Sequence, residues 1–418
     1  MRHPRWRDGW QKRLLLAGGA TVLAVVAGCS SSGGGTPEGG AAPSSQGPIT
    51  IGGTLGLTGA FSEPSAEYQA VYQLWQSQVD SHGGLLGRQV KLTILNDNST
   101  PATAAAEYQT LITQDHVSFL LAPYTTYVGA PVVPIAKAAG YVLFNGGFVG
   151  IQYFDQDNGW MVGSYTYQEP DYTEGVFKLM AAMPAAARPS KVAILTDQNP
   201  FTVVAQNGYQ GSGGALNFAR QYHMQVVFDQ EYPSTTTDFT STLEKAKASG
   251  AQALIVLGLP DDSDLIAKTV KVIGWKPVVE CMCGSQVTTL PNWPALGSAT
   301  DGVLGTDVAW ASEHFPGLAA LQAFAAKRGE SVLPSYDVTA YAILQMLQQA
   351  VEGAHSLDQA AIRDWLLHHT VRTAAGVFRL LPNGSPPYSE VVTQTIGSSQ
   401  QPVWPPSIAT AKLVVPLP

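Results

Sequence analysis

The sequence is poor in cysteine, in charged side chains and in long apolar runs, and each shortage excludes a class of protein. Three cysteines in 418 residues can form neither a disulfide scaffold nor a four-thiolate zinc site. Charged residues make up 13% of the chain, and its formal net charge is −8. The chain therefore lacks the basic surface with which proteins bind nucleic acids. A long apolar run occurs near the N-terminus and no second one follows, which excludes a permease.

What remains is the composition of a globular protein. Apolar residues make up 45% of the chain, enough to build a sizeable core. The 42 glycines and 28 prolines stay below the share that is typical of low-complexity chains. The length predicts two domains or one large one.

Residues 1–28 have the pattern of a secretory signal peptide. A basic stretch that ends at Arg13 precedes the apolar segment Leu14–Ala27, which is too short to span a bilayer but suits the central part of a signal. The segment Val26-Ala27-Gly28-Cys29 resembles a lipobox, where the signal is cut before a cysteine that receives lipid. We expect lipidation of Cys29 and an extracytoplasmic location on the cell membrane. The alternative is an ordinary signal peptide followed by a chance cysteine.

The lipidated Cys29 is followed by a Gly/Ser/Pro-rich stretch that ends at Pro48. The stretch has no apolar periodicity and cannot bury a face, so residues 29–48 are predicted to form a flexible tether. The folded part begins near Ile49.

From Ile49 onward, apolar strands alternate with helical segments. Three strand–helix units lead to Phe144, and the pattern restarts at Thr173. Repeated β-α units predict parallel sheets covered by helices on both faces. We therefore predict an α/β protein with two doubly wound parallel-sheet lobes. One long helix is expected at Val203–Tyr222, with Gly211–Gly214 as a close-packing site within it.

Sequence motifs of common enzymes are absent. The chain has no G-x-S-x-G, H-E-x-x-H or G-x-x-x-x-G-K-[ST] motif, and no G-x-G-x-x-G after a strand, which argues against hydrolase, zinc-protease and nucleotide-binding chemistry. His368 and His369 are expected to cap the end of a helix rather than to bind a metal. We predict no catalytic residues, no cofactor and no metal. An enzyme such as an amidase on the same scaffold is a remaining alternative.

Cys281 and Cys283 form a C-x-C pair. A disulfide with one intervening residue closes a strained ring, so it is not favoured. A metal site is not favoured either, because no further ligand is near in sequence. The preferred interpretation is two small residues at the end of a strand.

Two segments that follow strands are candidate binding loops. The first contains Tyr124, Thr125 and Thr126, whose hydroxyl and backbone N–H groups suit a carboxylate or a carbonyl. The alternative is that a threonine merely caps the helix. The second contains Asn145, Gly147 and Phe148, where glycine lets the backbone approach a ligand; a plain turn is equally consistent. An aromatic cluster follows, in which each member could equally be core: Trp160, Tyr165, Tyr167 and Tyr172.

An ordered set of segments resembles a known family. Its first-lobe members are Gly56-Leu57-Thr58-Gly59, Gly83–Arg88, Asn96-Asp97-Asn98 and Ala122-Pro123-x-Thr125-Thr126, and its second-lobe members are Lys191–Leu195, Asp238-Phe239-Thr240 and Gly250–Leu257. The set resembles the type I periplasmic binding proteins of the leucine/isoleucine/valine-binding branch, the substrate receptors of branched-chain amino-acid-type ABC transporters. The resemblance covers nearly all of the chain after Ile49.

The resemblance implies two lobes joined by three hinge crossovers, with a ligand in the cleft between them. Lobe 1 is expected at 49–166 plus 305–371 and lobe 2 at 167–304 plus 372–410, followed by a tail at 411–418. By analogy, Thr126 holds a ligand carboxylate, and the loop Gly147-Phe148-Val149 holds an ammonium group. Phe61 and Glu63 form part of the cleft rim.

Two positions depart from the pattern of the amino-acid binders in this family. Leu259 stands where these proteins often have a tyrosine, and Cys283 stands where they often have a carboxylate that faces the ammonium group. Glu280 lies three residues earlier, and a gap in the alignment could restore it to the site. Without that carboxylate, the ligand is expected to be a neutral amide, a carboxylate or an aromatic acid, because an unpaired buried charge is costly.

The sequence therefore predicts a monomeric receptor that binds a small amino-acid-like, carboxylate or amide ligand and delivers it to an ABC permease. The alternative is a sensory receptor of the same fold that signals to a membrane partner.

Overall fold

The computed structural model describes residues 47–415, except 167, 285–286, 291, 309–313, 331–332, 388–389 and 398. The expectations for the signal peptide, Cys29, most of the tether and Tyr167 lie outside the described residues. The described residues belong to one compact unit, Pro43–Pro418. No helix among them is both long and apolar enough to cross a membrane.

The first part of the chain forms a parallel five-stranded sheet with the order β2-β1-β3-β4-β5. Helices α1 to α5 connect and follow these strands, as the strand–helix alternation predicted. The strands are β1 (Ile49–Leu55), β2 (Val90–Asn96), β3 (Phe119–Leu121), β4 (Leu143–Asn145) and β5 (Met161–Gly163). The helices are α1 (Ser62–Ser81), α2 (Pro101–Thr113), α3 (Thr126–Gly129), α4 (Val132–Ala138) and α5 (Ile151–Asp157).

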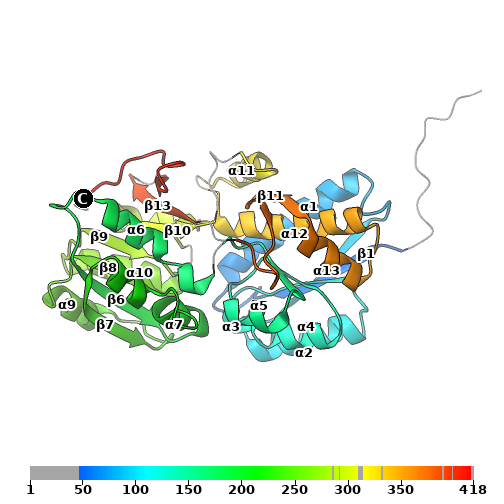
Figure 1. Cartoon of the computed structure of the whole chain (residues 1–418), viewed down its shortest axis with the longest axis horizontal. Helices are drawn as coiled ribbons and strands as arrows, with labels where there is room; N and C mark the ends of the chain where they lie inside the picture. The colour runs from blue at the N-terminus through cyan, green and yellow to red at the C-terminus, as the bar shows by residue number, and fades with distance from the viewer. Residues whose placement is uncertain are drawn as a thin grey trace, which may run out of the picture. The chain divides into compact units, whose positions relative to one another are not determined.

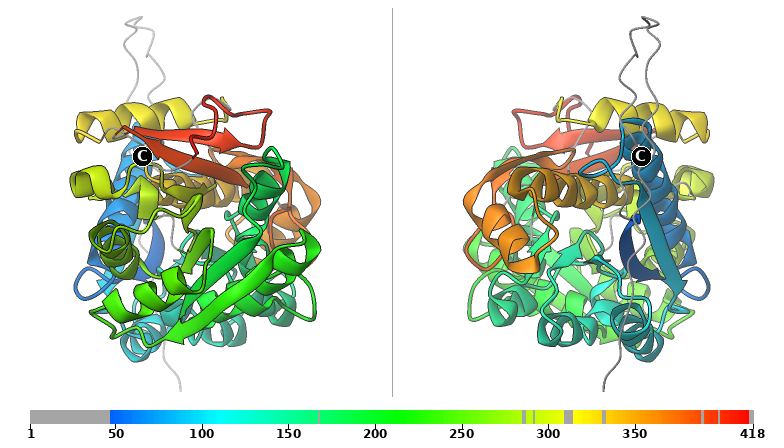
Figure 2. Two further views of the ribbon diagram at one scale, coloured as in Figure 1. Left: turned by 90° about the vertical axis from the view of Figure 1, so that its left-hand side faces the viewer. Right: turned by 90° about the vertical axis from the view of Figure 1, so that its right-hand side faces the viewer.

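The second part forms a seven-stranded sheet with the order β14-β13-β10-β9-β8-β6-β7. Strands β6 to β10 are parallel, whereas β13 runs antiparallel to β10 and β14, and the red β13–β14 hairpin lies at one edge (Figure 2). The strands are β6 (Lys191–Asp197), β7 (Gln225–Tyr232), β8 (Ala253–Leu257), β9 (Val279–Met282), β10 (Leu304–Asp307), β13 (Val391–Ile396) and β14 (Ser399–Trp404). The helices are η1 (Glu169–Asp171), α6 (Glu174–Ala182), α7 (Pro200–Asn207), α8 (Ala215–Gln221), α9 (Thr240–Ala248), α10 (Pro260–Val272), η2 (Val287–Thr289) and η3 (Trp293–Ala299).

Between β10 and β13 the chain returns to the first sheet. The long helix α12 (Ser335–Ala354) packs against α1, and α13 (Gln359–His368) packs against α12 (Figure 1). A hydrogen bond of 2.5 Å from the Tyr341 hydroxyl to the Gln78 side chain joins α12 to α1. The same return contains α11 (Leu318–Lys327) and the hairpin β11 (Thr370–Thr373) to β12 (Gly376–Arg379), of which β11 contacts α12. The chain thus passes three times between the two sheets.

Two of the passes lie a few residues from where the resemblance placed them. All of β10, Leu304–Asp307, pairs within the larger sheet, so the expected boundary between 304 and 305 falls inside a strand. The boundary expected between 371 and 372 falls inside β11, because hairpin pairing holds β11 and β12 together.

The predicted helix at Val203–Tyr222 is wrong: two helices, α7 and α8, replace it. Gly208, Gly213 and Gly214 have φ values of +83°, +65° and +86°, which a continuous right-handed helix cannot contain. A Cβ at Gly213 would overlap the Pro170 backbone. The glycines therefore form a turn that fits against η1.

The preferred interpretation of the C-x-C pair is also wrong, because Cys281 and Cys283 form a disulfide. Side chains two residues apart in a strand point to the same face. Their Cα atoms are 5.3 Å apart, within the range that a disulfide requires.

Candidate ligand-binding cleft

A cleft lies where the carboxyl ends of strands from both sheets meet. The segments after β3, β4, β5, β6, β8 and β9 each supply at least one wall residue within four positions of the strand end, the place where open α/β sheets bind ligands. The cleft encloses about 370 Å³, a volume that includes the open space at its mouth. Its lining consists of Tyr124, Thr125, Thr126, Gly147, Phe148, Val149, Tyr165, Tyr172, Phe201, Leu259, Gly284 and Tyr336.

The two threonines have different partners. Thr125 is the N-cap of α3, and its hydroxyl oxygen accepts a hydrogen bond from the Tyr127 backbone N–H at 3.3 Å. The Thr126 hydroxyl donates to the Val149 carbonyl at 2.6 Å and thereby ties the first binding loop to the second. The hydroxyl oxygen of Thr126 keeps an acceptor site, but its proton is already used within the protein.

Asn145 shapes the second loop without lining the cleft. Its side chain accepts from the Gly147 and Phe148 N–H groups at 3.1 and 3.0 Å and donates to the Phe148 carbonyl at 2.9 Å. Position 147 requires glycine, because a Cβ there would overlap the Pro123 carbonyl. This loop is therefore held rigidly against the first one.

Half of the residues that line the cleft are aromatic. The Tyr124 hydroxyl donates to the Tyr336 hydroxyl at 3.1 Å, and the Tyr172 and Phe201 rings meet edge to face at 4.9 Å. Burial raises the pKa of Tyr165 to about 12, so this phenol stays neutral at physiological pH. The wall thus offers ring faces and neutral hydroxyls, which suit a flat apolar ligand with a polar end.

Charged side chains are missing from the described lining: it contains no Asp, Glu, Lys, Arg or His. Glu63 lies near the start of α1, outside the lining, and burial raises the pKa of its carboxyl while contact with Asn292 partly offsets this. Phe61 is buried behind the wall, with its ring edge-on to Tyr124 at 5.8 Å.

Neither candidate for the ammonium-binding carboxylate position lies in the cleft lining. Glu280 lines a separate cavity, and its Cα lies four residues before Gly284, roughly 13 Å away along an extended chain. Cys283 is fully buried and disulfide-bonded. The alternative that a gap restores Glu280 to the cleft is therefore wrong.

Several residues of the cleft wall were not predicted from the sequence. Phe201 follows β6 and Gly284 follows β9, so the strand-end rule that found the first two loops could have found them. Tyr336 comes from α12, more than 200 positions after Tyr124, and no local pattern marks it. Its place depends on the return of the chain to the first sheet.

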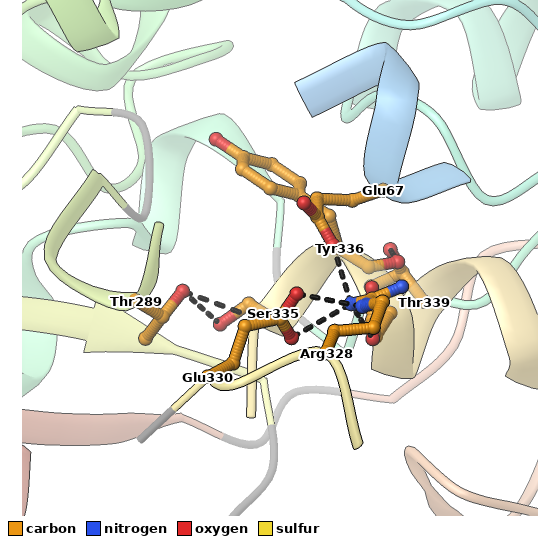
Figure 3. Close-up of polar contacts among 8 residues, drawn as sticks. Glu67, Thr289, Arg328, Glu330, Ser335, Tyr336 and Thr339 are labelled. Carbon is orange, nitrogen blue, oxygen red and sulfur yellow. Dashed lines mark hydrogen bonds and ion pairs between the residues drawn. The ribbon is translucent and has the colours of Figure 1, made fainter. Parts of the chain in front are cut away.

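A polar cluster lies beside α12, outside the cleft. The Arg328 guanidinium donates to Glu67 at 2.6 Å, to Glu330 at 2.6 and 2.7 Å, and to Asp337 at 2.8 Å (Figure 3). Burial raises the pKa values of Glu67 and Asp337, which Arg328 partly offsets. The three carboxyl groups lie close enough together to hold a metal ion, but the guanidinium already bonds to all of them.

Next to this cluster, Ser335 at the start of α12 bonds to the larger-sheet part of the chain. Its backbone N–H donates to the Thr289 hydroxyl at 3.1 Å, and its own hydroxyl donates to Asp307 (Figure 3 shows Ser335 and Thr289). These bonds connect the two lobes at one of the three passes.

Comparison with known proteins identifies the family. The family model described as "Periplasmic binding protein" matches residues 48–391. The chain belongs to the type I periplasmic binding proteins. This confirms the resemblance noted from the sequence and the two-lobed α/β fold. Because the family consists of receptors, it also confirms that the chain is not an enzyme.

Among curated relatives, the Leu/Ile/Val-binding protein homolog 7 of Brucella abortus (strain 2308) is 22% identical over 342 residues, which covers 79% of this chain and 83% of the relative. Among solved structures, LivJ of Streptococcus pneumoniae in complex with isoleucine has a TM-score of 0.72 at 18% identity and covers 84% and 97% of the two chains. A solute-binding protein of R. palustris in complex with benzoate has a TM-score of 0.72 at 15% identity and covers 85% and 96%. At these identities the structural similarity establishes the fold of this chain but does not identify its ligand.

Proposed function

We propose that this chain is the lipid-anchored, extracytoplasmic receptor of an ABC importer, and that its cleft binds a small aromatic carboxylate or amide. Each lobe supplies one wall, so a ligand bridges them and favours their closure. The permease then recognises the closed form.

The composition of the wall supports this ligand class. A zwitterionic amino acid needs a carboxylate beside its ammonium group, and the described lining has none. Leaving an ammonium group buried without a partner costs several kcal/mol. The rings instead match a flat ligand, such as the benzoate bound by the structural relative from R. palustris. The ligand carboxylate would face the Thr125 and Thr126 segment.

A thermal-shift panel tests the ligand class. We expect benzoate, hydroxybenzoates or aromatic amides to raise the melting temperature, because a ligand that binds the folded state at a concentration about 100 times its Kd stabilises it by about 2.7 kcal/mol. Leucine, isoleucine and valine should leave the melting temperature unchanged. The opposite pattern, with shifts for the aliphatic amino acids alone, would contradict the proposed ligand class.

Phe201→Ala tests whether the ligand lies against this wall. Removing the ring should weaken binding of the best aromatic ligand about 10- to 100-fold, since burial of a phenylalanine ring is worth about 1.5–3 kcal/mol. Phe228→Ala, on β7 of the same sheet and outside the lining, is the matched control and should bind normally. Isothermal titration calorimetry measures both, and equal affinities for the two variants would place the ligand elsewhere.

Cys29→Ser tests the anchor. Lipidation of both the sulfur and the new N-terminus gives stable membrane attachment, because one chain alone binds only marginally. We expect the variant to lose lipid labelling and to leave the membrane fraction, whereas Ser32→Ala should retain both. If unsubstituted protein takes up no lipid label, the ordinary signal peptide is the correct interpretation.

A further inference from the structure

A second cavity lies within the larger-sheet lobe. It is bounded by the C-terminal half of α10, the turn at Gly274–Lys276, η3 and β9, and it encloses about 620 Å³ including its mouth. None of its lining residues belongs to the cleft. They are Ala267, Val270, Lys271, Gly274, Trp275, Lys276, Glu280, Ser298, Ala299 and Asp301.

Glu280 is an unusual residue for the floor of such a cavity. It lies on β9, between β8 and β10 in the sheet, and is only 4% exposed. Its Oε1 has no hydrogen-bond partner among the described residues. Burial raises the pKa of this carboxyl to about 8, and Lys271 only partly offsets the effect. A buried carboxyl without a partner is costly, which points to a partner supplied from outside the chain.

The acidic and basic residues of the lining differ in their burial. The acidic Glu280 is buried, whereas the ammonium groups of Lys271 and Lys276 are on exposed residues. Asp301, the fourth charged lining residue, is half-buried and accepts a hydrogen bond from the Gly397 N–H at 3.0 Å. Trp275 and Val270 contribute buried apolar surface to the same lining. A ligand that matches this order is positive at its inner end, apolar in its middle and negative at its outer end.

We propose that this cavity binds a small ω-amino acid, a zwitterion in which an apolar chain separates the ammonium group, paired with Glu280, from the carboxylate, which faces Lys271 and Lys276. In the empty cavity at pH 7 the Glu280 carboxyl carries its proton. Pairing with the ammonium group ionises it, so binding releases one proton to solvent. This site is independent of the cleft and of the ligand proposed there.

Calorimetry of the full chain with 4-aminobutanoate, butylamine and butyrate tests the proposal. We expect 4-aminobutanoate to bind best, butylamine more weakly and butyrate not at all. At pH 7 the heat of 4-aminobutanoate binding should depend on the ionisation enthalpy of the buffer, because a proton is released. Glu280→Gln should weaken binding about 10- to 100-fold, the value of a hydrogen bond to a charged group.

Three other variants separate this site from the rest of the molecule. The double variant Lys271→Gln/Lys276→Gln should lose the preference for 4-aminobutanoate over butylamine, and Glu244→Gln, an exposed change on α9, should bind normally. Phe201→Ala should affect the cleft ligand and leave 4-aminobutanoate binding intact. The proposal is overturned if neither amine binds saturably, or if Glu280→Gln binds 4-aminobutanoate as tightly as the unsubstituted chain. Neither result would contradict the function proposed for the cleft.

Discussion

Replacing Arg328 with glutamine is expected to destabilise the fold by about 3 kcal/mol at neutral pH. Removal of one partner from a buried ion pair typically costs about 3–5 kcal/mol, and the lower end applies because the Arg328 side chain is 23% exposed. The variant leaves Glu67, Glu330 and the fully buried Asp337 without their shared cation. Urea denaturation at pH 7.5 measures the loss.

The loss in the Arg328→Gln variant should shrink at lower pH. Burial already raises the pKa values of Glu67 and Asp337, and removing the guanidinium raises them further. A carboxyl whose pKa is raised by folding stabilises the folded state at low pH and loses that contribution as pH rises. The variant should therefore approach the stability of the unsubstituted chain only as the pH falls below the ordinary pKa values of Glu67 and Asp337, which are 4.5 and 3.8.

The control for Arg328→Gln is Lys327→Gln, which removes the same charge from the exposed neighbouring position. We expect it to change stability by less than about 0.5 kcal/mol, as is usual for surface substitutions. Equal losses for the two variants, or a loss at position 328 that does not depend on pH, would show that the cluster acts only through general surface charge.

Replacing Glu280 with glutamine is expected to stabilise the unliganded protein at alkaline pH by a few kcal/mol. The pKa of Glu280 rises from 4.5 to about 8 on folding. Below pH 4.5 the carboxyl is protonated in both the folded and the unfolded chain, so it imposes no penalty. Between pH 4.5 and 8 the unfolded chain ionises first, and the stability of the folded state falls. Above pH 8 the penalty is constant.

Glutamine keeps the shape of Glu280 without its charge, so the variant and the unsubstituted protein should differ little at pH 4.5 and most at pH 8 to 9. Denaturation midpoints across this range measure the difference, and Glu244→Gln serves as the control. A Glu280→Gln variant that is less stable at pH 8 would mean that the carboxylate has a stabilising partner there, contrary to the structure.

The sequence predicted the fold well because its main signals are local. Strand–helix alternation predicted both sheets, and the rule that ligands meet the carboxyl ends of strands selected Tyr124 and Gly147, which both line the cleft. The break between α7 and α8 at Gly208–Gly214 was not predicted, because the helical periodicity of the apolar residues was given more weight than the glycines. Gly213 and Gly214 contact Pro170, which lies far away in the sequence, so this contact leaves no local signal.

The remaining features of the site depend on long-range geometry. Tyr336 reaches the cleft only because α12 returns to α1. Whether Glu280 or Cys283 faces a ligand depends on where β9 ends and which face each side chain takes. A one-residue change of register would exchange those faces. The ligand role of Tyr167 stays a prediction.

The return of α12 to α1 also constrains the order in which the protein can be made and folded. Strands β1 and β2 cover part of α1, but the part of its surface that packs against α12 stays uncovered until residues 335–354 have been synthesised. For a chain that is exported unfolded, this late completion of the first lobe delays stable folding until nearly the whole polypeptide exists. A first lobe built from discontinuous segments would thus slow the folding of a precursor that is exported in the unfolded state.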